Sequence, residues 1–182
     1  MDDEQILAAT VGEPPLTYRE VVVAEYDPEW PNWFARAADQ IRGALGDAVL
    51  QLDHVGSTSV PGLAAKPLID INLVVADTTD EAAYVPPLEA LGYVLRVREP
   101  DWYEHRMLRG YEPPVNLHVF AAGCEEIEKM LLFRDWLRTN DDDRELYRRT
   151  KRELAAKEWK YVQNYADAKS EVVQQILARA RS

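Results

Sequence analysis

The sequence contains little of what would mark a secreted or membrane protein. It has one cysteine, Cys124, among 182 residues, which excludes an intramolecular disulfide and fits a reducing compartment. Its apolar runs fall short of the roughly 20 residues of a membrane helix. The acidic first ten residues lack the apolar core of a signal peptide. We therefore expect a cytoplasmic protein that does not bind membranes.

Positive charge is also scarce. The chain has 21 lysine and arginine residues against 32 aspartate and glutamate residues, for a formal net charge of -11. Affinity for nucleic acids in general depends on Lys and Arg neutralising phosphates, so we expect no broad nucleic-acid surface. A small cationic pocket for one ligand is compatible with this charge. The composition does not determine the oligomeric state.

The order of the periodic segments predicts an α+β fold in a single domain. We expect an N-terminal arm at residues 1–19 and a domain at 20–182, divided into a sheet core (20–122) and a helical part (123–182). Apolar spacing and turn residues predict strands at 20–26, 49–55, 68–75, 93–97, 102–108 and 115–121. Helices are expected at 27–45 and 79–91, and again beyond residue 123. In that last region, Asp142 and Glu145 form a capping-box-like pair.

The segment DHVGSTSVPGLAAKPLIDINLVV, residues 53–75, carries the clearest chemical signal. Two strand-like runs flank a loop of small and hydroxyl residues that starts at Gly56, and Asp70 lies in the second run. Glycine lets a backbone approach a ligand closely, while amides and hydroxyls bind phosphate oxygens. The spacing matches neither a Walker loop nor GxGxxG. The alternative is a tight connection between elements that binds nothing.

Several charged residues lie near this segment in the predicted order of elements, and each has two interpretations. Lys66 reaches a phosphate or remains a solvated charge. Of Arg106 and Arg109 on one predicted strand, one clamps a phosphate or both lie on the surface. Arg134 and Asp135 pair with each other or contact the glycine loop. Lys151 and Lys169 are weaker cationic candidates.

Three segments in this order, HVGSTSVPGLAAKPLIDI, NLHVF and LLFRDWLR, resemble the GrpB family, and the similarity covers nearly the whole chain from about Val21. The resemblance implies a fold of the nucleotidyltransferase superfamily. That fold is a mixed β-sheet flanked by helices, here with a helical C-terminal subdomain. It also implies similarity to the domain fused to some bacterial dephospho-CoA kinases.

The superfamily pattern places a Gly-Ser turn before a strand that carries Asp-x-Asp or Asp-x-Glu. Here Gly56-Ser57 precedes Asp70-Ile71-Asn72, so the second acid is replaced by an amide. The segment that would supply a third acid offers His118, which is either a ligand or a hydrogen-bonded core residue. The resemblance implies a divalent metal, Mg²⁺ or Mn²⁺, held by Asp70, Asn72 and His118. This ligand set suits Mn²⁺ or Zn²⁺ better than Mg²⁺.

The expected function is binding of a nucleotide or another phosphorylated small molecule. As an enzyme, the protein would transfer a nucleotidyl group, with Asp70 as the catalytic metal ligand. The alternative is a non-catalytic binding or protein-folding accessory module related to the dephospho-CoA kinase C-terminal domain, which the amide at position 72 favours. The residues assigned to phosphate or nucleotide binding are Gly56, Ser57, Thr58, Ser59, Lys66, His54 and Arg106.

Overall fold

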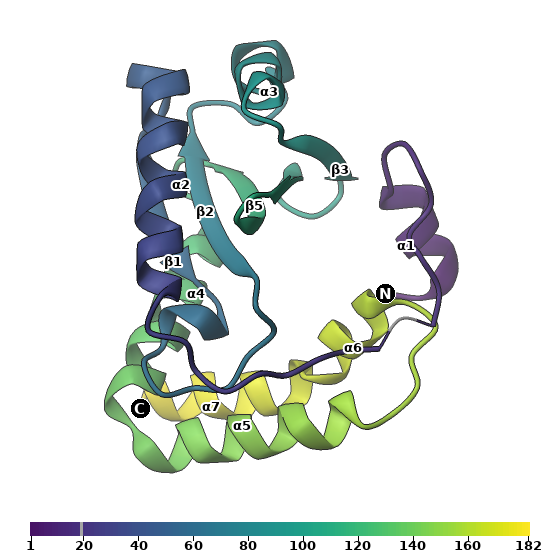
Figure 1. Cartoon of the computed structure of the whole chain (residues 1–182), viewed down its shortest axis with the longest axis vertical. Coiled ribbons are helices and arrows are strands. Elements are labelled where there is room, and N and C mark those ends of the chain that lie inside the picture. The colour runs from purple at the N-terminus through teal and green to yellow at the C-terminus, as the bar shows by residue number, and fades with distance from the viewer. Residues whose placement is uncertain (19) are drawn as a thin grey trace.

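The computed structural model describes residues 1–18 and 20–182 and contains one five-stranded sheet surrounded by helices (Figure 1). The strands are β1 (Gln51–Val55), β2 (Ile69–Val75), β3 (Val94–Glu99), β4 (His105–Tyr111) and β5 (Pro114–Ala121). Their order across the sheet is β1-β2-β5-β4-β3. β2 and β5 run parallel, and the other neighbours run antiparallel. The sheet is therefore mixed.

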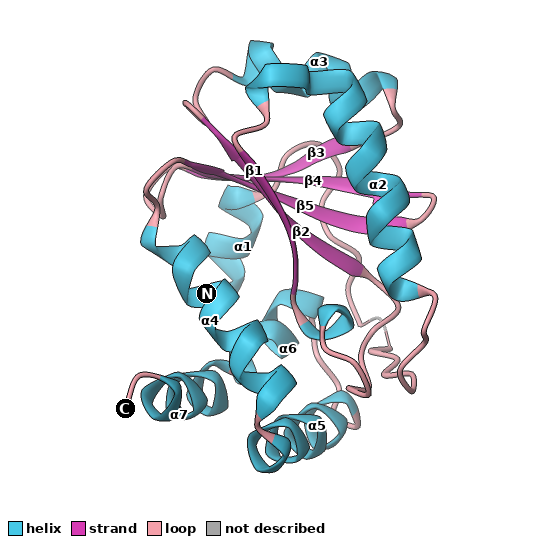
Figure 2. Ribbon diagram, turned by 90° about the vertical axis from the view of Figure 1, so that its left-hand side faces the viewer, coloured by secondary structure: helices cyan, strands magenta, loops and turns pink. Residues whose placement is uncertain are grey.

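Helices cover both faces and one end of this sheet. They are α1 (Asp3–Ala9), α2 (Trp30–Leu45), α3 (Glu81–Ala90), α4 (Glu125–Thr139), α5 (Asp141–Ala155), α6 (Val162–Ala168) and α7 (Ser170–Ala180). Figure 2 shows α2 on one side of the sheet and α4 on the other. In residues 1–18 and 20–182, no helix is long and apolar enough to cross a membrane.

The two faces of β2 differ in character because alternate residues of a strand point to opposite faces. Ile69, Ile71 and Leu73 are fully buried in the main apolar core, to which α2 and α3 also contribute. Val74 on the opposite face packs with residues of β5 and α4. Asp70 lies at the other end of that same face, where the polar residues gather. The site is thus built on the face that α4 covers only in part.

The C-terminal helices pack against the segment that follows the glycine loop. Val60 and Leu63 share an apolar cluster with residues of α4, α5 and α7. Asp143 links the same helices: it accepts a hydrogen bond from Trp136 Nε1 at 2.7 Å and pairs with Arg179. This arrangement confirms the predicted α+β class, a mixed sheet flanked by helices with a helical C-terminal part.

The N-terminal region differs from the prediction. The expected irregular arm contains α1, which a reciprocal capping box between Asp2 and Gln5 stabilises and which buries Ile6. The expected strand at residues 20–26 is absent from the described structure, since this segment forms one isolated bridge, between Ala24 and Ala65. The Val-rich pattern indicated burial without revealing that the segment lacks a partner strand. Residue 19 lies outside the described residues.

Three other helix or strand boundaries differ from the prediction. α2 begins at Trp30, because Asp27 accepts a hydrogen bond from the amide of Glu29 and so forms a preceding turn. β4 begins at His105, after a turn in which residues 103 and 104 have positive φ. The helix cap predicted at Asp142 lies at Asn140, whose side chain accepts from the amide of residue 143. Asn140 thus ends α4 and caps the N-terminus of α5.

Candidate functional site

Gly56 brings the end of β1 into contact with the carboxylate of Asp70 on β2. Its φ of 69° and ψ of -173° lie in a region that residues with side chains rarely adopt. A Cβ atom at this position would lie 2.5 Å from Oδ2 of Asp70, closer than non-bonded atoms approach. Both the turn and the close approach therefore require glycine, and they join the loop and the carboxylate into one site.

The next hydroxyl groups are used inside the loop. Thr58 is 1% exposed, and its Oγ1 donates to the carbonyl of Leu68 at 3.2 Å and lies 3.0 Å from Nε2 of His54. Ser59 donates to the carbonyl of Gly56 at 2.5 Å. These hydroxyls brace the turn. This corrects the expectation that the side chains of Thr58 and Ser59 contact a phosphate.

His54 lies on the other face of the sheet from Asp70. It pairs opposite Ile71, and its ring stacks on Phe34 of α2 with centroids 4.8 Å apart. Burial lowers the pKa of His54 to about 4, so the ring is neutral near pH 7. His54 therefore supports the loop from the core side, which corrects its assignment as a ligand-binding residue.

Two side chains of β5 hold Asp70. Nδ2 of Asn116 donates to Oδ1 of Asp70 at 3.2 Å, and Nε2 of His118 lies 3.5 Å from the same oxygen. Burial opposes ionisation, but the hydrogen bonds from His118 and Asn116 and the charge of Lys66 outweigh it and lower the pKa of Asp70. The carboxylate is ionised and 30% exposed. Asn116 escaped sequence reasoning, although its spacing of two from His118 predicts the same face.

A chain of polar groups crosses the sheet from His118 to Glu99. Nδ1 of His118 lies 3.1 Å from Nε2 of His105, and Nδ1 of His105 lies 2.7 Å from Oε2 of Glu99. Burial lowers the pKa of His105 to about 4, although the hydrogen bond with Glu99 opposes this. Both ring nitrogens of His118 thus face protein groups, which fixes its orientation toward Asp70.

Three basic side chains from separate parts of the chain surround Asp70. Lys66 belongs to the loop, Arg109 to β4, and Lys169 to the junction of α6 and α7, and all three are half-buried. Burial lowers the pKa of each, and the negative charge of Asp70 opposes that lowering in every case. Arg109 also donates to Oδ1 of Asn116 at 2.9 Å. The site is therefore locally cationic in an acidic protein.

The C-terminal helices supply a second layer behind the loop. Burial raises the pKa of Tyr147 on α5 to about 12, against a hydrogen bond with Ser57. Lys151 is 2% exposed, donates to the carbonyl of Ala64 and lies 4.9 Å from the ring centroid of Tyr147. Burial and the charge of Lys169 lower the pKa of Lys151 to about 7. Sequence patterns gave no signal that Tyr147 meets the loop.

Arg106 lies outside this site. It is 7% exposed on the core face, opposite Val119, and its Nε donates to Oε1 of Glu81 at 2.7 Å. Hydrogen bonds from Arg98 and Arg106 lower the pKa of Glu81 to about 2, against the effect of burial. This corrects the assignment of Arg106 to phosphate binding. Strand alternation brings Arg109 to the site instead.

Asn72 is closed to any ligand in this structure. It is fully buried, and its Nδ2 donates to Sδ of Met130 on α4 at 3.3 Å. Its Oδ1 has no hydrogen-bond partner among the described residues. Within residues 1–18 and 20–182, no three His, Cys, Asp or Glu side chains converge as a metal-ligand set. The expected Mg²⁺ or Mn²⁺ set of Asp70, Asn72 and His118 therefore does not fit the residues present.

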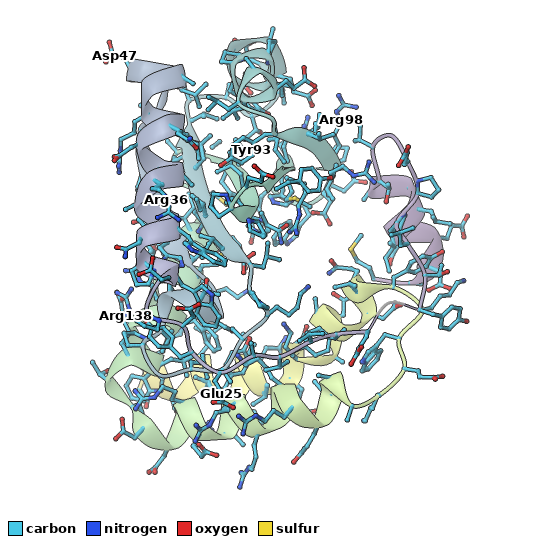
Figure 3. The ribbon with its side chains drawn as sticks, in the orientation of Figure 1. Glu25, Arg36, Asp47, Tyr93, Arg98 and Arg138 are labelled. Atoms are coloured by element: carbon cyan, nitrogen blue, oxygen red, sulfur yellow. The ribbon has the colours of Figure 1, made fainter. Side chains whose placement is uncertain are left out.

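Two arginines of α4 donate hydrogen bonds to backbone carbonyls of β1 and of the glycine loop. Arg138, labelled in Figure 3, donates from Nε and a terminal nitrogen to the carbonyl of Ser59 at 3.0 and 2.8 Å. Arg134 pairs with Asp135, one of the two expected contacts, and donates at 3.1 Å to the carbonyl of His54 on β1, just before the loop. The arginines line a cavity of about 340 Å³ that also borders α2 and β1. They fix the backbone on which the site depends.

Replacing Arg138 with methionine should loosen the glycine loop. The change removes two hydrogen bonds from a charged donor, and because Arg138 is partly exposed we expect a loss of about 1 kcal/mol in unfolding free energy. Amide hydrogen exchange across residues 56–60 should become faster. Arg148→Met removes an exposed pair with Glu145 and serves as the control. Equal exchange in both variants would contradict the bracing role.

Comparison with known proteins identifies the relatives of this chain. It is 56% identical over 180 residues to the UPF0157 protein BH1888 of Halalkalibacterium halodurans, covering 99% of this chain and 92% of that protein. It is 34% identical to the dephospho-CoA kinase of Mycolicibacterium paratuberculosis, over 69% of this chain but only 37% of the kinase. The kinase similarity thus concerns one part of a longer protein.

A solved structure shows the same family relationship. The crystal structure of the conserved protein GrpB from Enterococcus faecalis has a TM-score of 0.75 at 30% identity, covering 87% of this chain and 96% of that one. The H336N mutant of Cid1 poly(U) polymerase bound to MgATP gives a looser likeness, with a TM-score of 0.48 at 12% identity over 71% of this chain and 45% of that chain. The model of the family described as "GrpB protein" matches residues 20–179 of this chain. The chain therefore belongs to the GrpB family.

Proposed function

We propose that this protein binds a nucleotide or another phosphorylated small molecule at the face formed by the glycine loop and Asp70. The observation that carries this proposal is that Arg109 is joined to Asp70 through Asn116, while Lys66 and Lys169 interact with the same carboxylate, in a chain of net charge -11. Half-buried cations hold their charge at a cost, and an anionic ligand offsets that cost.

The glycine loop adds a geometric reason for the same proposal. Because Gly56 has no side chain, the backbone at the start of the loop lies directly against the carboxylate of Asp70. Ser57 follows Gly56 and is half-buried, with Tyr147 behind it. Phosphate oxygens accept hydrogen bonds from such hydroxyls and from lysine and arginine.

A thermal-shift screen tests the binding proposal. ATP, CoA, dephospho-CoA and inorganic phosphate are compared at fixed protein concentration, and a ligand at about 100 times its Kd should raise the Tm by roughly 5–10 °C. Lys66→Met should reduce that shift. Lys129→Met, on the exposed side of α4, should not change it. Absence of a shift with every ligand would remove the proposal.

A second candidate, a non-catalytic binding or folding accessory module, is favoured over nucleotidyl transfer by the buried amide of Asn72. Two-metal phosphoryl transfer needs several negatively charged oxygens, and the site offers one carboxylate, Asp70. Similarity to part of dephospho-CoA kinases supports the idea of an accessory module. Pyrophosphate release from ATP distinguishes a non-catalytic module from a nucleotidyltransferase. Release that Asp70→Asn abolishes would establish a transferase.

A further inference from the structure

The position where a second metal-binding carboxylate would stand is sealed by α4. Asn72 is fully buried, and its amide nitrogen is bound to Met130. An aspartate there would be a buried charge without a partner, which costs several kcal/mol rather than creating a metal ligand. A divalent cation would therefore find no second acidic oxygen on β2.

The other expected ligand, His118, is also engaged on both sides. Its Nδ1 faces His105, which is itself tied to Glu99, and its Nε2 faces Asp70. Asp70 and His118 together would give a metal two protein ligands, and no third His, Cys, Asp or Glu side chain converges with them among residues 1–18 and 20–182. The imidazole is therefore oriented as a hydrogen-bonding partner of Asp70.

The charges around Asp70 have the opposite sign to those of a metal site. Arg109 is joined to Asp70 through Asn116, by hydrogen bonds of 2.9 and 3.2 Å. Lys66 and Lys169 also interact with the charge of Asp70, and Asp167 is a second acid near Lys169. Lys151 is a further buried lysine, and burial together with the charge of Lys169 lowers its pKa. A metal site collects negative oxygens to hold a cation, whereas this one already carries fixed positive charge.

We propose that the site binds a polyphosphate chain, such as that of a nucleoside triphosphate, without a divalent metal ion, and that Lys66, Arg109 and Lys169 neutralise its charge. This proposal rests on the proposed binding of a phosphorylated ligand. A polyphosphate matches three cations better than a single phosphate does, because more of its oxygens are charged. Asp70 lies among the cations before the ligand arrives, and its negative charge opposes the binding of phosphate oxygens.

Calorimetric titration with AMP, ADP, ATP and inorganic tripolyphosphate tests the proposal, once in EDTA and once in excess Mg²⁺. We expect ATP and tripolyphosphate to bind more tightly than ADP, and ADP more tightly than AMP, in EDTA. Mg²⁺ should leave ATP affinity unchanged or lower it, since it cancels part of the ligand's charge. Salt should weaken binding in proportion to the charge neutralised.

Variants separate this mechanism from a metal-dependent one. Lys169→Met should weaken ATP binding about tenfold or more, since it removes a charged hydrogen-bond donor, and Lys169→Arg should restore it. Lys129→Met should have no effect, because that lysine pairs with Glu126 away from the site. Asp70→Asn should bind at least as tightly as the unchanged protein.

The outcomes are distinguishable. Binding that requires Mg²⁺, or that Asp70→Asn abolishes in a folded protein, would overturn metal-free binding while leaving the proposed function intact. Equal affinity for AMP and ATP would overturn the polyphosphate class. If no phosphorylated compound binds under either condition, the proposed function itself fails. Circular dichroism of each variant establishes that it is folded.

Discussion

Gly56→Ala should destabilise the protein by about 2–3 kcal/mol and weaken ligand binding by more than about tenfold. The φ and ψ of this residue, 69° and -173°, are strained for any residue that has a Cβ atom. That atom would also lie 2.5 Å from Oδ2 of Asp70, so the loop backbone beside the proposed ligand site must shift. Urea unfolding and calorimetric titration with ATP measure the two effects.

Gly62→Ala is the matched control for this substitution. Gly62 belongs to the same loop and also has a positive φ, 77°, but no heavy atom lies within 4 Å of an added Cβ atom. We expect it to cost about 1–2 kcal/mol of stability through backbone strain alone and to leave ATP affinity unchanged. If the two variants bind ATP equally well, the contact between Gly56 and Asp70 does not organise the site.

Acid should destabilise the fold between about pH 6.5 and pH 4, before the paired carboxylates titrate. Burial lowers the pKa of both His54 and His105 from 6.5 to about 4. Above pH 6.5 both histidines are neutral in the folded and unfolded chains, and their shifts have no effect. As the pH falls through this window, only the unfolded chain takes up protons, so the free energy of unfolding decreases. Each histidine contributes a loss of about 3 kcal/mol when the window has been crossed.

The measurement is urea unfolding at several pH values between 7 and 4. His54→Asn should remove about half of the decrease, because one of the two histidines remains. Glu81 separates this effect from ordinary acid unfolding, since its pKa of about 2 means that its ion pairs lose stability only as the pH falls from 4.5 toward 2. An unchanged pH dependence in His54→Asn would show that His54 is not buried in its neutral form.

The sequence predicted that Gly56 and Asp70 belong to one site, because a glycine loop joins two strand-like runs and the family resemblance pairs such a turn with the carboxylate. In the structure Gly56 directly follows β1, and Asp70 lies on its antiparallel neighbour β2. By contrast, the choice between Arg106 and Arg109 depended on the register of β4 against β5. A shift of one residue reverses every side chain, and a strand predicted three residues early gives no reliable face.

The cations that complete the site were only partly visible in the sequence. Lys169 and Tyr147 come from helices far along the chain, and nothing in the local pattern shows that they pack beside the loop. The fully buried state of Asn72 depends on Met130, which α4 brings across the sheet. The sequence shows that an amide replaces the second carboxylate of the superfamily pattern. Only the packing shows that a ligand has no access to Asn72.

The sequence by itself determined the α+β class, which follows from hydrophobic periodicity and turn chemistry between residues close in the chain. Its three motifs carried the resemblance to the GrpB family, and that resemblance implied the pairing of a glycine turn with Asp70. The tertiary structure decided which charges meet at the carboxylate, and therefore whether the site collects cations or anions. That choice depends on electrostatic interactions between distant segments, and their distances exist only once the helices have packed.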